Sequence, residues 1–376
     1  MPRMRGAPMR IELIRRPERS LRWAILSPVI AIALTVATGF VIFAAVGANP
    51  FQALYIYFIE PFTAFWSIED LIIKAVPIIL IAVGLSFCYL SNSWNIGAEG
   101  QLAAGAILGS ILPIYLPDWH GPLILPAMLL LGILGGMAYG AIPALLKNRF
   151  GANEILTSLM LVYVAQLLLD WLARGPWRNP AGHNFPDSRP FDDGQILPVL
   201  FGDNVRVSVL FVLVVVFAAW FVLRRTLTGF QIAVLGQAPR AGAFAGFSQR
   251  RMVLLTFLIS GGLAGLAGIC EVAGPIGMLR TSVSPGYGFT GIIVAFLGRL
   301  HPVGILVAGL LLALSYIGGE GAQIALGISD QITRVFQGLL LFFVLACDTF
   351  VFYRIRLVRP VAGPSLLPAR EASHGN

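Results

Sequence analysis

The sequence has few charged residues and few of the side chains that usually perform catalysis or bind metal ions. Only 12% of its 376 residues are charged, and it contains three cysteines and four histidines. Cys88, Cys270 and Cys347 lie inside apolar stretches, without the spacing of a disulfide framework or a zinc site. We therefore expect no metal site and no cofactor.

The sequence also lacks the short motifs that mark common catalytic sites. It contains no GxxxxGKS or GxxxxGKT phosphate loop, no HExxH zinc motif and no GxSxG nucleophile elbow. Catalysis, including ATP hydrolysis, is therefore not expected from this chain alone.

Long apolar runs are the main feature of the sequence. Hydrophobic residues make up 57% of the chain, and its mean hydropathy is +0.82. A typical soluble domain has about 45–50% apolar residues, so the composition indicates a polytopic membrane protein. The net charge of +8 comes mostly from Lys and Arg in short segments between apolar runs, which is typical of a membrane surface. Nucleic-acid binding is therefore not expected.

The apolar runs predict an all-α fold with about ten transmembrane helices, because about 20 largely apolar residues cross a bilayer as a helix. The eighth and ninth spans are short and rich in glycine, so we expect them to be tilted, broken or re-entrant. The predicted spans are 24–46, 71–90, 98–117, 122–146, 155–173, 206–223, 252–273, 285–298, 302–317 and 334–353.

The positions of Lys and Arg predict the orientation, because positive charges are retained on the cytoplasmic side. With ten spans, 19 of the 26 basic residues fall on the side that holds both termini, so both termini are expected to be cytoplasmic. The chain then consists of a basic cytoplasmic tail (1–23), a transmembrane domain (24–353) and a second cytoplasmic tail (354–376). The charge-free stretch 23–59 is longer than the apolar core of a signal peptide, so we expect a retained anchor.

Two polar regions lie within the transmembrane domain. Residues 174–205 are expected to form an external loop, and residues 224–251 a cytoplasmic segment. Glycines in the fourth and seventh spans, among them Gly136 and Gly265, predict close packing of helices, because small residues let backbones approach in a membrane.

A polar segment, Asn92-Ser93-Trp94-Asn95-Ile96-Gly97-Ala98-Glu99-Gly100-Gln101, separates the second and third spans. Polar groups are costly in hydrocarbon, and irregular backbone is tolerated at membrane depth only where protein buries it or water reaches it. The segment therefore indicates a pathway or a site.

A second polar segment, 229–247, lies on the predicted cytoplasmic side between the sixth and seventh spans. It is too short and too polar to cross the membrane. After Pro239 a run of small residues predicts a short helix with a shallow surface, which ends at Gly246. Such a helix can dock into a groove on another protein; an ordinary connecting loop with one helical turn is the alternative.

This second segment resembles the coupling segment of bacterial ATP-binding-cassette (ABC) importer permeases for branched-chain amino acids, ribose, simple sugars and nucleosides. Residues 260–268 (SGGLAGLAG) resemble the glycine-rich helix of that family, and 286–298 (GYGFTGIIVAFLG) resemble its following membrane motif. The block 95–101 (NIGAEGQ) resembles the subgroup that serves basic-membrane-lipoprotein receptors, whose members carry nucleosides or simple sugars. The chain departs from the family pattern where Ala238 precedes the proline and Gly242 replaces an alanine.

The resemblance implies a type II-like ABC importer permease in the bacterial cytoplasmic (inner) membrane. The implied partners are a cytoplasmic ABC ATPase, a second permease subunit (a paralogue or another copy), an extracytoplasmic solute-binding lipoprotein and the membrane lipid. The implied solute is a nucleoside or a simple sugar; a permease for branched-chain amino acids and an ion-coupled secondary transporter are the alternatives. The residues implied in ATPase coupling are Gln237, Pro239, Arg240, Ala241, Gly242, Ala243, Ala245 and Gly246.

A nucleoside or sugar needs hydrogen-bonding and aromatic side chains at the pathway wall. Three candidates have structural alternatives: Glu99 could cap the third span, Asn153 could cap the fifth, and Trp94 could be an interfacial aromatic. The candidates near breaks in the apolar runs are Trp94, Asn95, Glu99, Gln101, Asn153, Glu154, Thr157, Tyr287 and Phe289. Glu271 and Arg280 suggest a gate or receptor contact, or a solvated ion pair.

Overall fold

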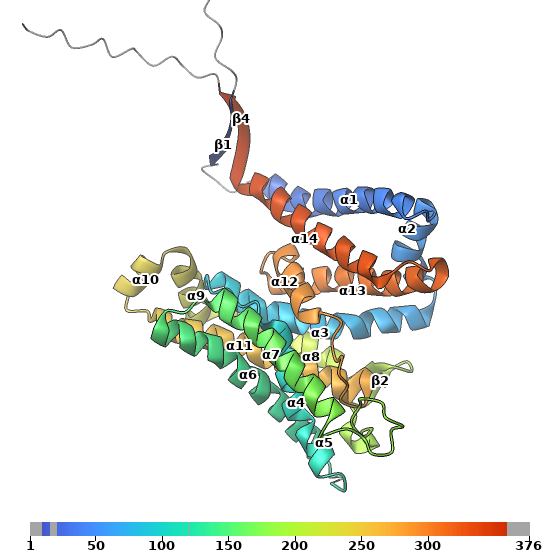
Figure 1. The fold of residues 1–376 in the computed structure, drawn as a ribbon. Helices are drawn as coiled ribbons and strands as arrows, with labels where there is room; N and C mark the ends of the chain where they lie inside the picture. Colours follow the sequence, from blue (N-terminus) through green and yellow to red (C-terminus); the bar gives the residue numbers. More distant parts are fainter. Residues whose placement is uncertain (1–9, 16–20, 120, 359–376) are drawn as a thin grey trace, which may run out of the picture.

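The computed structural model describes residues 10–15, 21–119 and 121–358, and this part of the chain is largely helical (Figure 1). Its α-helices are α1 (Leu21–Ala45), α2 (Pro50–Phe58), α3 (Phe65–Leu90), α4 (Ala98–Gly109), α5 (Ile111–Tyr115), α6 (Ile124–Phe150), α7 (Glu154–Arg174), α8 (Ser208–Arg225), α9 (Leu227–Gln237), α10 (Pro239–Phe244), α11 (Gln249–Glu271), α12 (Tyr287–Leu297), α13 (Pro302–Leu326) and α14 (Asp330–Phe352). Shorter helical turns are η1 (Glu60–Phe62), η2 (Asp193–Gln195) and the π-helical η3 (Val272–Ile276).

Several helices have lengths that match the predicted spans. Within the described residues, six helices are long and apolar enough to cross a membrane: α3, α6, α7, α8, α11 with η3, and α13. Three shorter apolar helices, Val29–Ala45, Tyr287–Leu297 and Arg334–Cys347, fall within other predicted spans. The predicted span 98–117 is divided into α4 and α5 at Ser110, and the predicted span 285–298 contains the 11-residue helix α12. The multiple membrane-spanning helices are confirmed, and the count of ten stays a prediction.

Two small antiparallel sheets were not expected in a chain predicted to be all-α. Strand β1 (Arg10–Arg15) pairs with β4 (Tyr353–Val358), with Arg10 opposite Val358, and β2 (Val199–Phe201) pairs with β3 (Val205–Arg206). The β1–β4 pairing joins the two predicted tails, and a contact between segments this far apart has no local sequence signal. The tail residues 1–9, 16–20 and 359–376 lie outside the described residues.

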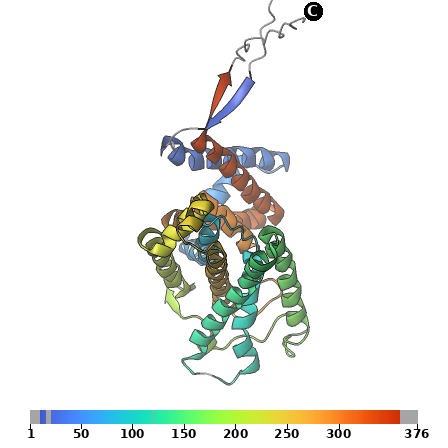
Figure 2. The ribbon, with the colours of Figure 1, turned by 90° about the vertical axis from the view of Figure 1, so that its left-hand side faces the viewer.

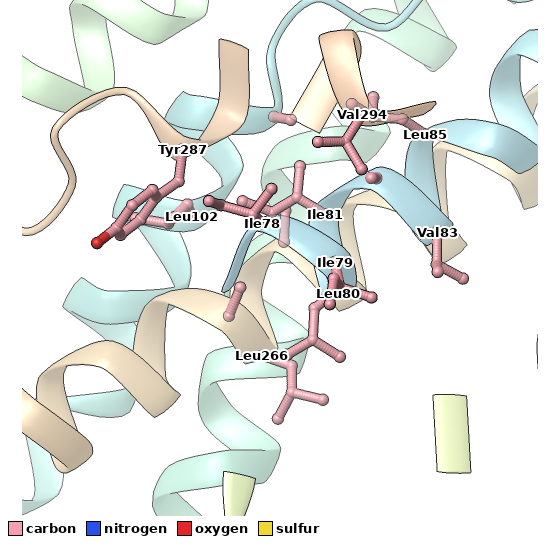
Figure 3. Close-up of a cluster of buried hydrophobic side chains, with 14 of the residues drawn as sticks. Ile78, Ile79, Leu80, Ile81, Val83, Leu85, Leu102, Leu266, Tyr287 and Val294 are labelled. Atoms are coloured by element: carbon pink, nitrogen blue, oxygen red, sulfur yellow. The ribbon is translucent and has the colours of Figure 1, made fainter. Parts of the chain in front are cut away.

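The centre of the helical domain is formed by α3 and α11. Helix α11 packs against α6, α3 and α4, and α3 also contacts α12 and α13. Figure 3 shows the buried aliphatic side chains of α3 between residues 78 and 85, which meet Leu102 of α4, Leu266 of α11 and Val294 of α12. Few residues of α7 and α8 are buried, with 28% and 17% of their apolar windows inside the protein, as expected for helices at the edge of a bundle.

Glycine allows α6 and α11 to cross closely. A Cβ atom added at Gly136 would clash with the carbonyl oxygen of Gly261, and one added at Gly265 would clash with the carbonyl oxygen of Gly132. The prediction of close packing by these glycines is confirmed. Close packing of this kind stabilises helix association in lipid, where the hydrophobic effect does not drive helices together.

The two polar regions of the chain lie at opposite ends of α3. The backbone of Leu90, at the last turn of α3, packs against Gly236 of α9. Near the first turn, the carboxylate of Glu69 accepts a hydrogen bond from the backbone N–H of Asp203 at 3.3 Å. Figure 1 shows α10 on the left of the molecule and β2 on the right. Figure 2 looks from that left-hand side, with the yellow helix α10 toward the viewer.

Candidate functional site

The side chains of Asn95 and Gln101 face each other inside the protein. Asn95 Nδ2 donates to Gln101 Oε1 at 3.0 Å, and Gln101 Nε2 donates to Asn95 Oδ1 at 3.1 Å. Asn95 Nδ2 also donates to Ser260 Oγ at 3.0 Å, and Asn95 Oδ1 accepts from the backbone N–H of Gly97 at 2.9 Å. We call Asn95, Gln101, Ser260 and Gly97 the asparagine network. It ties the loop before α4 to α4 itself and to α11.

The asparagine network is closed off from solvent. Asn95 is 0% exposed and Gln101 is 1% exposed. The backbone around them is also paired, since Tyr89 Oη donates to Asn95 O at 2.9 Å and Ile96 N donates to Ser158 Oγ at 3.1 Å. Polar groups in a dry interior are stabilised only when they are hydrogen-bonded, and here both amide side chains are.

Trp94 lies at the end of the molecule that holds α9. Its ring is near the rings of Tyr89 and Phe296, with centroid distances of 5.4 and 6.0 Å, and its side chain is 39% exposed. Its backbone N–H points to Glu154 Oε1 at 3.4 Å, and Glu154 also binds Lys147 Nζ at 2.5 Å. The partly exposed ring fits the interfacial alternative as well as a place on a pathway.

Asn153 begins helix α7. Its Oδ1 accepts from the backbone N–H groups of Ile155 at 2.9 Å and Leu156 at 3.4 Å, so the capping alternative is confirmed. Thr157 Oγ1 donates to the carbonyl oxygen of Asn153 at 3.0 Å. Asn153 is exposed and Thr157 half-buried, so hydrogen bonds within the first turn of α7 engage both side chains.

Glu99 does not cap its own helix but stabilises the start of another. Its Oε2 accepts a hydrogen bond from the backbone N–H of Gly288 at 2.6 Å, in the first turn of α12. A Cβ atom at position 288 would collide with the backbone of Glu99, so glycine is needed for the two chain segments to approach this closely. A carboxylate at a helix N-terminus is favourable electrostatically. The capping role that the sequence suggested for the third span therefore applies to α12.

Glu99 also borders a cavity of about 440 Å³ between α4, α7 and the segment that precedes α12. Its wall is a mixture of aliphatic and polar side chains, and we call it the polar cavity after the latter. Of the predicted solute contacts, Glu99 alone is among the described residues that line this cavity. The sequence reasoning missed Gln166 and Asp170, although polar residues inside an apolar span are a signal that could have found them. The lining residues are Glu99, Leu102, Ala103, Tyr163, Gln166, Leu167, Leu169, Asp170, Thr281, Ser282, Val283 and Ser284.

Tyr287 and Phe289 follow on α12 and lie in different surroundings. Tyr287 is 1% exposed and its ring meets that of Tyr316 edge-on at 5.7 Å, whereas Phe289 is 41% exposed. Tyr287 is thus part of the core (Figure 3), and Phe289 is accessible at the surface.

Glu271 and Arg280 border a second, charged cavity of about 410 Å³ at the end that holds β2 and β3. Asp187, in the predicted external loop, lies opposite Arg280 in a β-bridge, with 3.8 Å between the guanidinium and the carboxylate. Arg206 Nη1 donates to the carbonyl oxygen of Leu197 at 2.6 Å. The described ion pair of Arg280 is therefore with Asp187 and not with Glu271.

Helices α9 and α10 form a compact protrusion. Gly242 is buried against the side chain of Leu235, and its carbonyl oxygen accepts from the N–H of Phe247 at 2.9 Å. Gly246 ends the protrusion with a φ of +81°, a left-handed conformation that glycine adopts easily. The predicted short helix after Pro239 is therefore present.

The surface of this protrusion is formed by the predicted coupling residues. Gln237, Pro239, Arg240, Ala241, Ala243, Ala245 and Gly246 are exposed, and Gly242 is buried. Phe244, which sequence reasoning did not single out, is 95% exposed. A large aromatic ring on an otherwise shallow surface is a typical anchor for a partner protein.

The described residues offer no metal site, since no group of three or more His, Cys, Asp or Glu side chains is close enough there to hold an ion. Two features stand out in the part of the chain that the structure describes: buried polar contacts beside a cavity, and an exposed helical protrusion.

Comparisons with known proteins agree with this arrangement. The chain is 34% identical to the glucose ABC transporter permease protein of Haloferax volcanii over 92% of this chain and 94% of that protein. It is 27% identical to a nucleoside ABC transporter permease protein of Lactococcus lactis, over 85% of this chain and 90% of that protein. It is 26% identical to a guanosine ABC transporter permease protein of Bacillus subtilis, over 89% and 95%.

A match to one protein family extends over most of the described helical domain. Residues 67–345 match the family described as branched-chain amino acid transport system / permease component, from the start of α3 to the last part of α14. This range includes the asparagine network, the polar cavity and the α9–α10 protrusion. The chain therefore belongs to this family of ABC transporter permeases.

Proposed function

We propose that this chain is the membrane-spanning subunit of an ATP-driven importer whose solutes are nucleosides or simple sugars. The observation that carries the proposal is the near-full-length similarity to permeases named for glucose, nucleosides and guanosine. The block 95–101 resembles the same subgroup, and its polar residues join α4, α11 and α12.

The proposed partners are a cytoplasmic ABC ATPase, a second permease subunit and an extracytoplasmic solute-binding lipoprotein. The sequence contains no phosphate loop, so ATP would be hydrolysed on a separate subunit. The α9–α10 protrusion would bind that subunit, with Phe244 as the anchor and the coupling residues 237–246 around it. The contact of Gly242 with Leu235 of α9 would transmit motion of the ATPase to the membrane helices.

We also propose ten spans with both termini in the cytoplasm of a bacterial inner membrane. The six long helices, the three shorter apolar helices, and α4 together with α5 would supply the ten. The β1–β4 pairing supports termini on one side. Arg299, just after α12, donates to Ser27 Oγ near the start of α1 at 2.6 Å. Phe296, in the last turn of α12, stacks on Tyr89 at the end of α3, with 5.1 Å between the ring centroids. Since this end of α3 packs against α9, the start of α1 lies at the same end of the bundle.

The predicted solute contacts then divide into two groups along a pathway. Glu99 would lie on the wall of the polar cavity, and the asparagine network would hold α4 in place against α11. Trp94, Thr157 and Phe289 would lie nearer the cytoplasmic exit or the surface. The external segment 174–205 would face the solute-binding lipoprotein.

The test is transport by the complete complex. The chain would be purified with its partner permease, ATPase and lipoprotein, reconstituted in proteoliposomes, and assayed for ATP-dependent uptake of uridine, guanosine, glucose and leucine. Uptake of a nucleoside or of glucose supports the proposal. Uptake of leucine alone, or uptake driven by an ion gradient without ATP, would overturn it.

A further inference from the structure

We infer that the cavity between α4, α7 and residues 281–284 is a binding site for an uncharged solute rich in hydroxyl groups. The inference rests on the proposed function and adds to it a location and a basis for selectivity. None of the predicted contacts except Glu99 lines this cavity, so most of the proposed site is new. Its volume of about 440 Å³ lies within the range of about 300–1,000 Å³ that is typical of small-molecule sites.

The first argument is the position of Gln166. It lies twelve residues after the start of α7 and eight before its end, which puts it about 18 Å from one end and about 12 Å from the other. Its side chain is exposed. An exposed amide near the middle of a membrane helix is unfavourable against hydrocarbon, so such residues face a water-filled cavity or another protein. Gln166 lines the cavity, and it therefore marks a hydrated space at membrane depth.

The second argument is the chemistry of the wall. Three hydroxyl side chains from the segment before α12, Thr281, Ser282 and Ser284, line the same cavity as the amide of Gln166. Ser284 Oγ accepts from the backbone N–H groups of Gly286 at 3.1 Å and Tyr287 at 2.8 Å and is hydrogen-bonded to the Glu99 carboxylate. Thr281 and Ser282 are therefore the wall hydroxyl groups that can bind a solute. Tyr163 adds a half-exposed ring, on which a sugar or base can stack.

The third argument is the charge of the wall. Its two ionisable carboxyl groups are those of Glu99 and Asp170, and no Lys, Arg or His is among the described residues that line it. Asp170 is paired with Arg174 at 2.7 Å on the outer rim, and Glu99 accepts from Gly288 N. The N-terminus of α12 is therefore already occupied by a carboxylate and is not open to an anionic solute.

This distribution of charge selects between solute classes. A carboxylate or phosphate in the cavity would approach the carboxylate of Glu99, and Arg174, the cation next to Asp170, is already paired with the Asp170 carboxylate. Such an approach is unfavourable in a partly dry site. Hydroxyl groups can donate to those carboxylates and accept from the serine and threonine hydroxyls. The cavity thus fits a sugar or the ribose of a nucleoside better than a free amino acid, which carries its own carboxylate.

Cysteine protection tests the site directly. Gln166→Cys would be made in the reconstituted complex, and the rate of its modification by a water-soluble thiol reagent measured. The described native cysteines are buried, so they should react slowly. Glucose or uridine at about twice its dissociation constant should slow the reaction about threefold, following simple occupancy, and glucuronate and leucine should not. The matched control is Gln323→Cys, an exposed glutamine on α13 outside the cavity.

Uptake by the same complex distinguishes an error in the inferred site from an error in the proposed function. If Gln166→Cys still transports glucose or uridine but neither solute protects it, or if glucuronate protects as well as glucose, the inference is wrong. If the wild-type complex transports no nucleoside or sugar, the proposed function itself fails. The pair Gln166→Leu with Ser282→Ala should reduce uptake at least about tenfold, since losing two polar contacts costs about 1.4 kcal/mol or more. Gln323→Leu should leave it unchanged.

Discussion

Asn95 and Gln101 exchange two hydrogen bonds, of 3.0 and 3.1 Å, between their side-chain amides. They are six residues apart, one in the loop before α4 and the other in its first turn. Each amide uses both its donor and its acceptor group, so the pair holds the loop against the helix and Ser260 joins them to α11.

Replacing Asn95 by alanine should destabilise the fold. Gln101 would lose both hydrogen bonds to Asn95, and leaving a buried polar group unsatisfied costs about 1–3 kcal/mol. We expect a lower melting temperature in detergent and less assembled complex. Asn204→Ala, at an exposed asparagine in the β2–β3 turn, is the control. Equal melting temperatures for the two variants would show that the asparagine network contributes little.

The hydrogen bond that Glu99 accepts from the start of α12 should contribute more to the stability of the fold than the charge of Glu99 does. Glu99→Gln keeps an oxygen that can accept from Gly288 N, and Glu99→Ala removes it. We therefore expect Glu99→Ala to lose about 1–3 kcal/mol of stability and Glu99→Gln to lose less, measured by thermal unfolding. An alanine variant as stable as the wild type would contradict the tether between α4 and α12.

Gly265 should tolerate no side chain. Its added methyl group would meet the carbonyl oxygen of Gly132 across the α6–α11 crossing, and overpacking of this kind typically costs about 1–3 kcal/mol. Gly338→Ala is the matched control, because nothing lies within 4 Å of a Cβ there. In an α-helix that change should stabilise by about 0.5–1 kcal/mol. Similar melting temperatures for both variants would disprove the close crossing.

Phe244 should be the anchor of the ATPase contact. Phe244→Ala should weaken binding of the ATPase subunit by about 2 kcal/mol or more, which is about 30-fold in dissociation constant. Co-purification and uptake coupled to ATP hydrolysis would both fall. Phe185→Ala also removes an exposed ring, 67% accessible, from the opposite end of the molecule, and should leave ATPase binding intact. Normal ATPase binding by Phe244→Ala would place the contact elsewhere.

The local features of the fold could be predicted from the sequence. The apolar runs indicated the long helices. The capping alternative for the pathway candidate Asn153 could be seen in the sequence, because capping depends on neighbours along the chain. The small residues after Pro239 predicted α10 for the same reason. The exposed Phe244 within that helix was overlooked, although its size among small residues was visible.

Contacts between distant segments could not be predicted in this way. The sequence offered Asn95, Glu99 and Gln101 together as contacts on a pathway. The fold buries two of them in a network with Ser260 and turns the third toward α12, 189 residues later. The β1–β4 pairing and the ion pair of Arg280 with Asp187 are of the same kind.

The sequence by itself determined that this protein is a polytopic membrane protein of the permease family and that a short helix follows Ala238. Those properties depend on composition, on apolar runs and on spacing within a few turns. The tertiary structure alone decided which polar groups are buried against each other and which line a cavity. Burial and hydrogen-bond pairing depend on how α4, α7, α11 and α12 pack, and helices far apart in the chain meet only when the whole bundle forms.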